Sequence, residues 1–298
     1  MLDGIVWLFS HLGMGFVDLF YALTHPASWL NWGDKQAMMK FIYYGASTEF
    51  LFVVIDIFLV LLVVGVIWRN VMWRVVRIIE GFSNAVGRFF AWAGLIMVLQ
   101  QIMIIFLQRI FRVSEISIGP FGMVMSKDIS WYAEELKLFN AFVVTLACAY
   151  TFVQGGHVRV DLFYSKMKFR TKRVFDMFGS IVLIMPTMML IWMFGWFFMW
   201  RHLVTPKVAA ANSFDALMRK AQLLKWNVET IGFSPNGFNG YFIFKILIVS
   251  FAGMMILQGA AFFFRSLLEC IEGPESEGKY LDKDKLNDEL AETVAAIH

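Results

Sequence analysis

The sequence predicts an all-α integral membrane protein, with a four-helix transmembrane core and an N-terminal extension of one or two further helices. Of its 298 residues, 59% are hydrophobic and 16% are charged, whereas a soluble domain carries about 25% charged residues. The apolar residues form continuous runs of about 20 residues, the length that a helix needs to cross a bilayer. Continuous runs also exclude the alternating strands of a membrane β-barrel.

Five of these runs are long enough to span. The first lies upstream of the four that form the predicted core: 48–68, 89–108, 138–153 (extendable back to Trp131), 174–200 and 241–264. Residues 4–23 are less apolar, and one polar stripe runs along them, made of Asp3, Ser10, His11 and Asp18. The stripe faces water if the helix is interfacial, or packs against other helices if it is a sixth span. We favour the sixth span, because a pair of extra helices leaves the N-terminus on the side that it would occupy without them.

Basic residues predict which segments between spans are cytoplasmic. Residues 155–173 carry six bases and residues 69–88 carry four, so we expect both connecting segments to be cytoplasmic. The bases of 201–240 are spread over a long stretch, and we expect this segment and 113–130 on the outside. The tail after Arg265 is then cytoplasmic, and from Glu269 it is acidic and typical of a solvated, partly helical end.

Motifs for enzyme chemistry or metal binding are absent from the sequence. It has no phosphate-binding glycine loop, no H-E-x-x-H and no paired cysteines. We therefore expect no catalytic residue, no metal and no cofactor. The net charge of +3 is too small to indicate a nucleic-acid surface.

Three polar residues inside the spans stand out because such residues are costly in lipid: Asp56, Gln100 and Gln101. They either bind a transported ion or solute, or form hydrogen bonds between helices. We expect hydrogen bonds between helices, because no broken helix surrounds any of the three.

Residues 131–164 contain the most informative motif. Trp131, Glu134 and Glu135 precede a span, and the span ends in Gly155 and Gly156, followed by three charged residues, His157, Arg159 and Asp161. The glycines suit a helix stop, and the charged side chains can pair with one another or bind lipid head groups. The whole pattern resembles the core signature of the small permease subunit (DctQ type) of tripartite ATP-independent periplasmic (TRAP) transporters. Residues 108–112 and 234–237 agree with that family as well.

The resemblance covers about residues 75–270. It implies an N-terminal extension (1–74), a DctQ-like core (75–270) and an acidic cytoplasmic tail (271–298). It also implies a multi-pass protein of the bacterial inner membrane that works with a large TRAP permease subunit, a periplasmic solute-binding protein and membrane lipids. Together they would import an organic anion, commonly a carboxylate, by sodium-coupled, elevator-type transport. The small subunit would be a scaffold, and the solute would be set by its partners.

Two other classes of function are weighed against this one. An independent channel or carrier would need a polar face shared by several spans, and only Asp56 and the two glutamines are candidates. An enzyme that acts on lipids would need a clustered acid, base or metal site near one interface. His157, Arg159 and Asp161 are the only candidates for such a site.

Residues 213–228 predict a helix outside the membrane. Ser213 suits an N-cap, and an apolar stripe follows at positions 214, 217, 221, 224 and 228. Arg219, Lys220 and Lys225 lie largely off this stripe. We expect these three bases either to steer a binding protein with an acidic rim or to contact lipid head groups.

Overall fold

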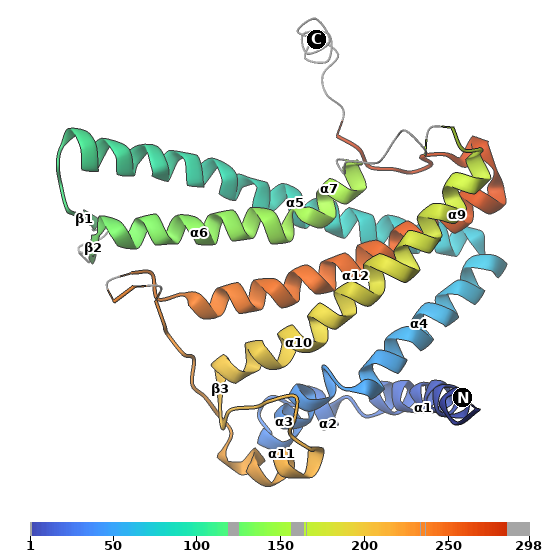
Figure 1. Ribbon diagram of the computed structural model, residues 1–298. Helices are drawn as coiled ribbons and strands as arrows, with labels where there is room; N and C mark the ends of the chain where they lie inside the picture. The colour runs from blue at the N-terminus through green and yellow to red at the C-terminus, as the bar shows by residue number, and fades with distance from the viewer. Residues whose placement is uncertain are drawn as a thin grey trace, which may run out of the picture.

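The computed structural model describes residues 2–118, 125–155, 164, 166–232, 234–235 and 237–284, which form a helical bundle with two small antiparallel sheets (Figure 1). The helices along the first half of the chain are α1 (Leu2–Thr24), α2 (Ala27–Leu30), α3 (Lys35–Tyr44), α4 (Thr48–Ile67), α5 (Arg69–Ile105), α6 (Ile129–Leu146) and α7 (Cys148–Gln154). Those of the second half are α9 (Phe169–Gly179), α10 (Met185–Leu203), α11 (Phe214–Lys220) and α12 (Tyr241–Glu272). Strand β1 (Glu115–Ile118) pairs with β2 (Met125–Asp128), and β3 (Val204–Thr205) pairs with β4 (Lys225–Trp226).

Short non-α turns complete the helical segments. A π-helical turn, Phe106–Ile110, extends α5, and another, Ser180–Ile184, joins α9 to α10 just before Pro186. Proline has no backbone N–H to donate within a helix. A wider turn in front of it avoids leaving a backbone carbonyl group without a hydrogen-bond donor. The 3₁₀ turns Ala221–Leu223 and Pro274–Ser276 follow α11 and α12.

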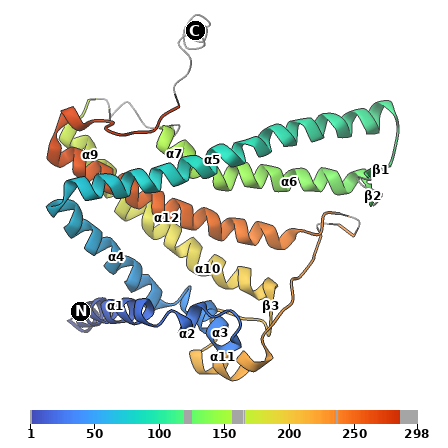
Figure 2. The ribbon, with the colours of Figure 1, turned by 180° about the vertical axis from the view of Figure 1, so that it is seen from behind.

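The spans predicted from the sequence are confirmed as helices. In the described residues, five helical segments are long and apolar enough to cross a membrane: Asp3–Thr24, Thr48–Ile67, Arg69–Ile110, Phe169–Leu203 and Tyr241–Glu272. Helices α6 and α7, bent by 41° where they meet, are a sixth candidate if the pair counts as one span. Helix α12 is central, since it packs against α5, α6, α9 and α10 (Figures 1 and 2).

We name the two ends of the bundle by what lies there. The tail end is where α9 begins at Phe169 and α12 ends at Glu272, and the hairpin end is where β1 and β2 lie and α12 begins at Tyr241. Residues 69–88, which the sequence predicts to connect two spans, are helical, because α5 begins at Arg69. The reason is that Met72, Trp73 and Val76 fall on one helical face and pack against α12. The four arginines of this stretch are exposed.

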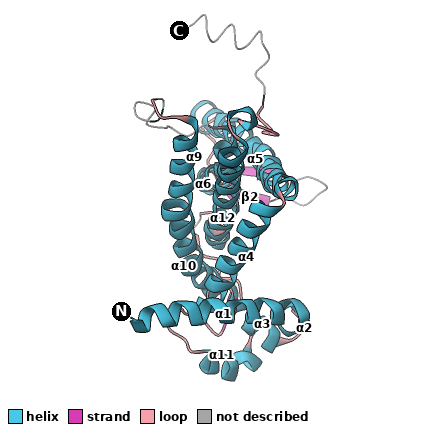
Figure 3. Cartoon of the chain, turned by 90° about the vertical axis from the view of Figure 1, so that its right-hand side faces the viewer, coloured by secondary structure: helices cyan, strands magenta, loops and turns pink. Residues whose placement is uncertain are grey.

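Helix α1 lies crosswise to the core helices, at the side of the bundle where α4 begins (Figure 3). Trp7 and His11 are one turn apart, yet both rings contact Phe52 of α4, with centroids 5.6 and 5.3 Å away. Gly15, one turn further on, meets Phe52 as well. Helices packed along their lengths would pair successive turns, so these contacts indicate a crossing. The polar stripe is split, with His11 and Asp18 half-buried and Asp3 and Ser10 exposed.

The predicted helix over 213–228 is wrong in its extent. Ser213 does cap α11, and its hydroxyl oxygen accepts a hydrogen bond from the backbone N–H of Ala216 (3.4 Å). The α-helix ends at Lys220, however, and the chain turns extended at Leu224 so that Lys225 and Trp226 pair with β3. Pairing with the strand after α10 thus overrides the helical periodicity. The stripe still serves packing, because Leu217, Ala221 and Leu224 are buried in a cluster shared with α3 and α10.

Candidate functional site

The motif Trp131-x-x-Glu134-Glu135 lies in the first turns of α6, at the hairpin end. A Glu134 carboxylate oxygen accepts a hydrogen bond from the backbone N–H of Phe238 (2.9 Å), two residues before the N-cap of α12. The ring of Trp131 contacts the ring of Phe238 edge-on, with centroids 5.4 Å apart. Gly237 is buried beside them, and a Cβ at this position would overlap the Glu134 carboxylate. The motif therefore fixes the start of α12 against α6.

Glu135 holds the neighbouring helix, α5. Its carboxylate accepts a hydrogen bond from the Gln100 side-chain amide (3.0 Å), which also donates to the backbone carbonyl of Tyr132 (3.3 Å). The expectation that Gln100 bonds between helices is confirmed. We call Gln100, Trp131, Glu134, Glu135 and Phe238 the hairpin-end cluster.

Asp56 behaves differently, and the same expectation is wrong for it. Its side chain is fully buried in α4 beside Gly15, and neither carboxylate oxygen finds a hydrogen-bond partner among the described residues. Gln101 is exposed on α5. The sequence alone does not show that Asp56 has no partner, because the packing of α1 against α4 decides which groups surround its side chain.

The second half of the motif lies outside the described residues: Gly156, His157, Arg159 and Asp161. The structure does show the helix stop before it. Gly155 follows α7 with φ of +75°, the left-handed conformation that favours glycine at a helix C-terminus.

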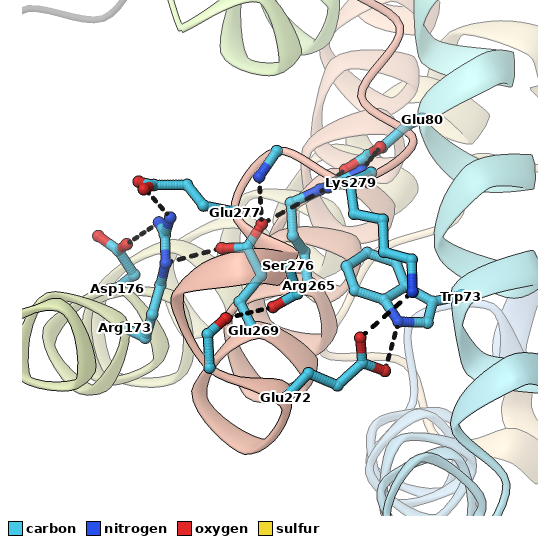
Figure 4. Close-up of polar contacts among 12 residues, drawn as sticks. Trp73, Glu80, Arg173, Asp176, Arg265, Glu269, Glu272, Ser276, Glu277 and Lys279 are labelled. Atoms are coloured by element: carbon cyan, nitrogen blue, oxygen red, sulfur yellow. Dashed lines mark hydrogen bonds and ion pairs between the residues drawn. The ribbon is translucent and has the colours of Figure 1, made fainter.

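A second polar cluster lies at the tail end and joins α5, α9 and α12 (Figure 4). Arg265 of α12 donates two hydrogen bonds to the Glu80 carboxylate of α5, at 2.7 and 2.5 Å. Arg173 of α9 forms an ion pair with Glu269 of α12 at 2.7 Å. Glu80, Arg265 and Glu269 are only 3%, 6% and 1% exposed. We call Glu80, Arg173, Arg265 and Glu269 the tail-end network.

The pairs of the tail-end network are linked to each other. Glu269 also lies 3.7 Å from Arg265, one turn away on the same helix. Arg173 lies 3.3 Å from Asp176 and 3.0 Å from Glu277 as well. Each guanidinium forms ion pairs with carboxylates, so the buried charges at these helix ends neutralise one another. Chemically this arrangement fixes helices in place and leaves no free acid–base pair for catalysis.

A comparison with known families places this geometry in context. The family model of the tripartite ATP-independent periplasmic transporters, DctQ component, matches residues 121–269, which is half of the chain. The chain belongs to the DctQ family. It is thus the small membrane subunit of a TRAP transporter, a multi-pass protein of the inner membrane and not an enzyme. No curated protein and no solved structure matches it significantly.

The DctQ match encloses most of both clusters. Trp131, Glu134 and Glu135 fall within it, as do Arg173, Arg265 and Glu269. Glu80 and Gln100 fall outside it, because the match leaves residues 1–120 uncovered, including 75–120, which the sequence resemblance assigned to the core. Helix α5 thus supplies a partner to each cluster from outside the matched region.

The segment after α12 also lies beyond the DctQ match. The expectation of a solvated end is wrong for Glu269, which is buried, and for Glu272, which is partly buried, whereas Glu275, Glu277, Asp282 and Asp284 are exposed. Residues 285–298 lie outside the described residues. The backbone N–H of Gly278 donates to Glu269 (3.1 Å), and the backbone carbonyl of Lys279 accepts from Arg265 (2.8 Å). The indole N–H of Trp73 donates to Glu272 (2.9 Å). The chain folds back because the buried network needs these backbone groups as partners.

Further along, Asp282 and Asp284 bind α5 and α7. Arg88 pairs with both aspartates, at 3.1 and 2.5 Å, and Asn84 donates to Asp282 (3.0 Å). Tyr150 of α7 donates to Asp284. Hydrogen bonds from Arg88 and Asn84 lower the pKa of Asp282, and those from Tyr150 and Arg88 lower the pKa of Asp284. We call residues 273–284 the tail strap.

The three basic residues that we expected on the outer loop are in different secondary-structure elements. Arg219 and Lys220 are in the last turn of α11, and Lys225 is in β4. All three are exposed, and among the described residues none of them forms an ion pair. They are therefore free to meet a charged partner.

Sequence analysis missed the tail-end network. A signal was present: Arg265 and Glu269 stand four residues apart, a spacing that places both on one face of a helix. The sequence alone does not identify the pair as buried, because the apolar run ends at Phe264 and the charges after it resemble a solvated tail. Among the described residues no group of three or more His, Cys, Asp or Glu side chains could hold a metal ion.

Proposed function

We propose that this DctQ subunit is the static scaffold of a sodium-coupled TRAP transporter that imports an organic anion, with a carboxylate as the expected solute class. A large permease subunit carries the elevator-type transport path, and a periplasmic binding protein delivers the solute. The sodium coupling and the solute class follow from the resemblance to the family.

The observation that supports a scaffold is how the polar groups of the tail-end network and the hairpin-end cluster are used. A carrier needs polar groups that bind and release its cargo, and such groups line a cavity between helices. Here Glu80, Arg265, Glu269 and Arg173 are paired with one another, and Gln100 is paired with Glu135. These bonds join helices and leave the groups unavailable to a solute.

Reconstitution into liposomes tests the proposal. The chain alone should move no solute under a sodium gradient. Vesicles that hold this chain together with the large subunit, and receive the binding protein, should take solute up. Sodium-driven uptake by the chain alone would show instead an independent carrier. The control is a vesicle with the large subunit alone, which separates a missing scaffold from a missing carrier.

We propose the exposed apolar faces of α5 and α6 as the contact with the large subunit. Trp92, Leu95 and Leu99 of α5 are 64%, 49% and 57% exposed. Replacing Trp92 and Leu99 by Ala should lower co-purification of the large subunit. The matched control is Leu190→Ala with Phe194→Ala, two equally exposed apolar residues of α10. Equal loss in both variants would contradict the assignment to α5.

We further propose that the hairpin end faces the periplasm and the tail end the cytoplasm. The basic segment 155–173 motivates this orientation. In a variant whose two cysteines are replaced by Ala, a cysteine at Ser213 should react with an impermeant reagent from outside, and one at Ser165 should not. The reverse labelling would invert the orientation.

His157, Arg159 and Asp161 are proposed to anchor the end of α7 and to position the basic helix α9. Alanine at any of the three should reduce the yield or stability of the complex more than the apparent affinity for solute. A sharply raised half-saturating solute concentration in Arg159→Ala, with assembly intact, would favour a direct binding role.

Arg219, Lys220 and Lys225 are proposed to steer the binding protein. The apolar residues of the same segment pack against α3, so the three basic residues are on a well-packed segment. Steering acts mostly on the association rate and weakens as salt rises. Changing all three to Glu should slow association at low salt, and the difference should shrink at high salt. The control reverses Arg69, Arg74 and Arg77 at the tail end. Equal rates for both variants at both salt levels would leave lipid contact as the role of these bases.

A further inference from the structure

A basic cluster lies where α10 ends and α12 begins, apart from both polar clusters described above. Lys245 is one turn inside α12, and the residue is only 3% exposed. Its ammonium nitrogen lies over two aromatic rings, 4.5 Å from the centroid of Tyr241 and 4.6 Å from that of Phe198. Such rings attract a cation but cannot neutralise it.

Among the described residues, the acid that interacts with Lys245 is Glu229, and it is already engaged. Glu229 forms an ion pair with Lys207 at 3.1 Å, and its carboxylate lies 3.5 Å from the His202 imidazole. Lys245 interacts electrostatically with Glu229, Lys207 and Arg201. Arg201, Lys207 and Lys245 thus face one carboxylate, Glu229, and in the described part of the chain neither Lys245 nor Arg201 has an ion-pair partner of its own. The cluster keeps an excess of positive charge.

An unmatched ammonium at the end of a span is costly, and an anion placed beside it removes that cost. The surface leading to the cluster is apolar: Phe194 and Phe198, one turn apart on α10, are 74% and 45% exposed. Arg201 follows on the same helical face, three residues after Phe198. A molecule with a negative head and an apolar chain fits both parts of this surface.

We propose that Arg201, Lys207 and Lys245 bind the phosphate group of an anionic phospholipid, whose acyl chain lies along Phe194 and Phe198. A free phosphate ion shares the head-group chemistry, but it leaves the apolar surface uncovered. The proposed lipid site lies along the exposed face of α10 that carries Phe194 and Phe198. This inference does not depend on the scaffold proposal.

Lipid binding is measured on the purified full-length chain, by native mass spectrometry and by the shift of its thermal unfolding. The probes are phosphatidylglycerol, phosphatidylcholine and inorganic phosphate. Phosphatidylglycerol should bind and stabilise the chain more than phosphatidylcholine, whose choline cation is repelled by the cluster. Inorganic phosphate at the same concentration should give neither effect.

Variants locate the site. Lys245→Met and Arg201→Gln should each bind phosphatidylglycerol about fivefold more weakly, the effect of one lost charge near a membrane surface. Lys245→Arg should keep the binding. Arg201→Gln changes an exposed side chain, so it tests the site even if Lys245→Met fails to fold. The control, Arg69→Gln, removes one charge at the tail end and should bind as the unaltered chain does.

Three results would overturn the proposal. The first is equal binding of phosphatidylglycerol by the unaltered chain and Arg201→Gln. The second is equal binding of the two lipids by the unaltered chain. The third is stabilisation by inorganic phosphate equal to that by phosphatidylglycerol, which would assign the cluster to a free anion.

Discussion

The tail end and the hairpin end of the bundle are joined by different kinds of contact. At the tail end, guanidinium–carboxylate pairs cross between α5, α9 and α12, and backbone groups of the tail strap complete them. At the hairpin end, the links are one hydrogen bond to a backbone N–H, one amide–carboxylate bond and an aromatic contact. Buried charges must meet their partners, whereas a glycine beside a carboxylate only permits close approach.

The difference has a consequence for a scaffold subunit. A buried arginine without its glutamate leaves a charge in an apolar setting, so we expect the tail-end network to favour one arrangement of its helices. The hairpin end loses less when one bond is stretched. We therefore expect the tail end to be the fixed part of the subunit.

Breaking the tail-end network should give the largest effect. Glu80→Gln removes the carboxylate closest to buried Arg265 and leaves Glu269 at 3.7 Å, and the free energy of unfolding should fall by about 3–5 kcal/mol. The measurement is denaturant unfolding in detergent. The double variant Glu80→Leu with Arg265→Met removes both charges and should recover much of the loss. A double variant as unstable as the single one would mean that shape, not charge, holds this end.

At the hairpin end the effect should be smaller. Glu134→Ala leaves the partly buried backbone N–H of Phe238 without its carboxylate acceptor, which costs about 1–3 kcal/mol. Glu134→Gln keeps an oxygen in place and should be milder. A loss for Glu134→Ala as large as that for Glu80→Gln would remove the contrast between the two ends.

The tail strap should give the smallest effect and a pH dependence. The pKa values of Asp282 and Asp284 are lowered in the folded chain, chiefly by hydrogen bonds from Arg88, Asn84 and Tyr150. Carboxyls with lowered pKa stabilise the folded state above their unfolded pKa, and this contribution is lost as pH falls through the folded pKa. A spin label at Lys283 should therefore become more mobile as the pH falls from the ordinary aspartate range through the lowered pKa values of the two carboxyls, reversibly. In Asp282→Asn with Asp284→Asn it should be mobile at every pH, and a pH dependence that survives there would assign the release to other groups.

The spans were predictable because continuous apolar runs have one stable solution in lipid. The motif at Trp131, Glu134 and Glu135 was recognisable too, but its geometry was not, since Gly237 and Phe238 lie far along the sequence. The turn at Leu224 and the fold-back after Glu272 depend on partners from other helices. Local periodicity cannot indicate such contacts, and in both places tertiary pairing overrode it.

The measurement that tests the static scaffold most directly is a distance across the tail end. Spin labels are placed on two exposed positions, Arg74 of α5 and Thr171 of α9, in a chain whose Cys148 and Cys270 are replaced by Ala. The assembled transporter is measured without ligands, with sodium, and with sodium, solute and binding protein. We predict one narrow distance distribution that is the same in all three states. A second distance, or a shift that follows sodium or solute, would show that this subunit moves during transport and would contradict the account.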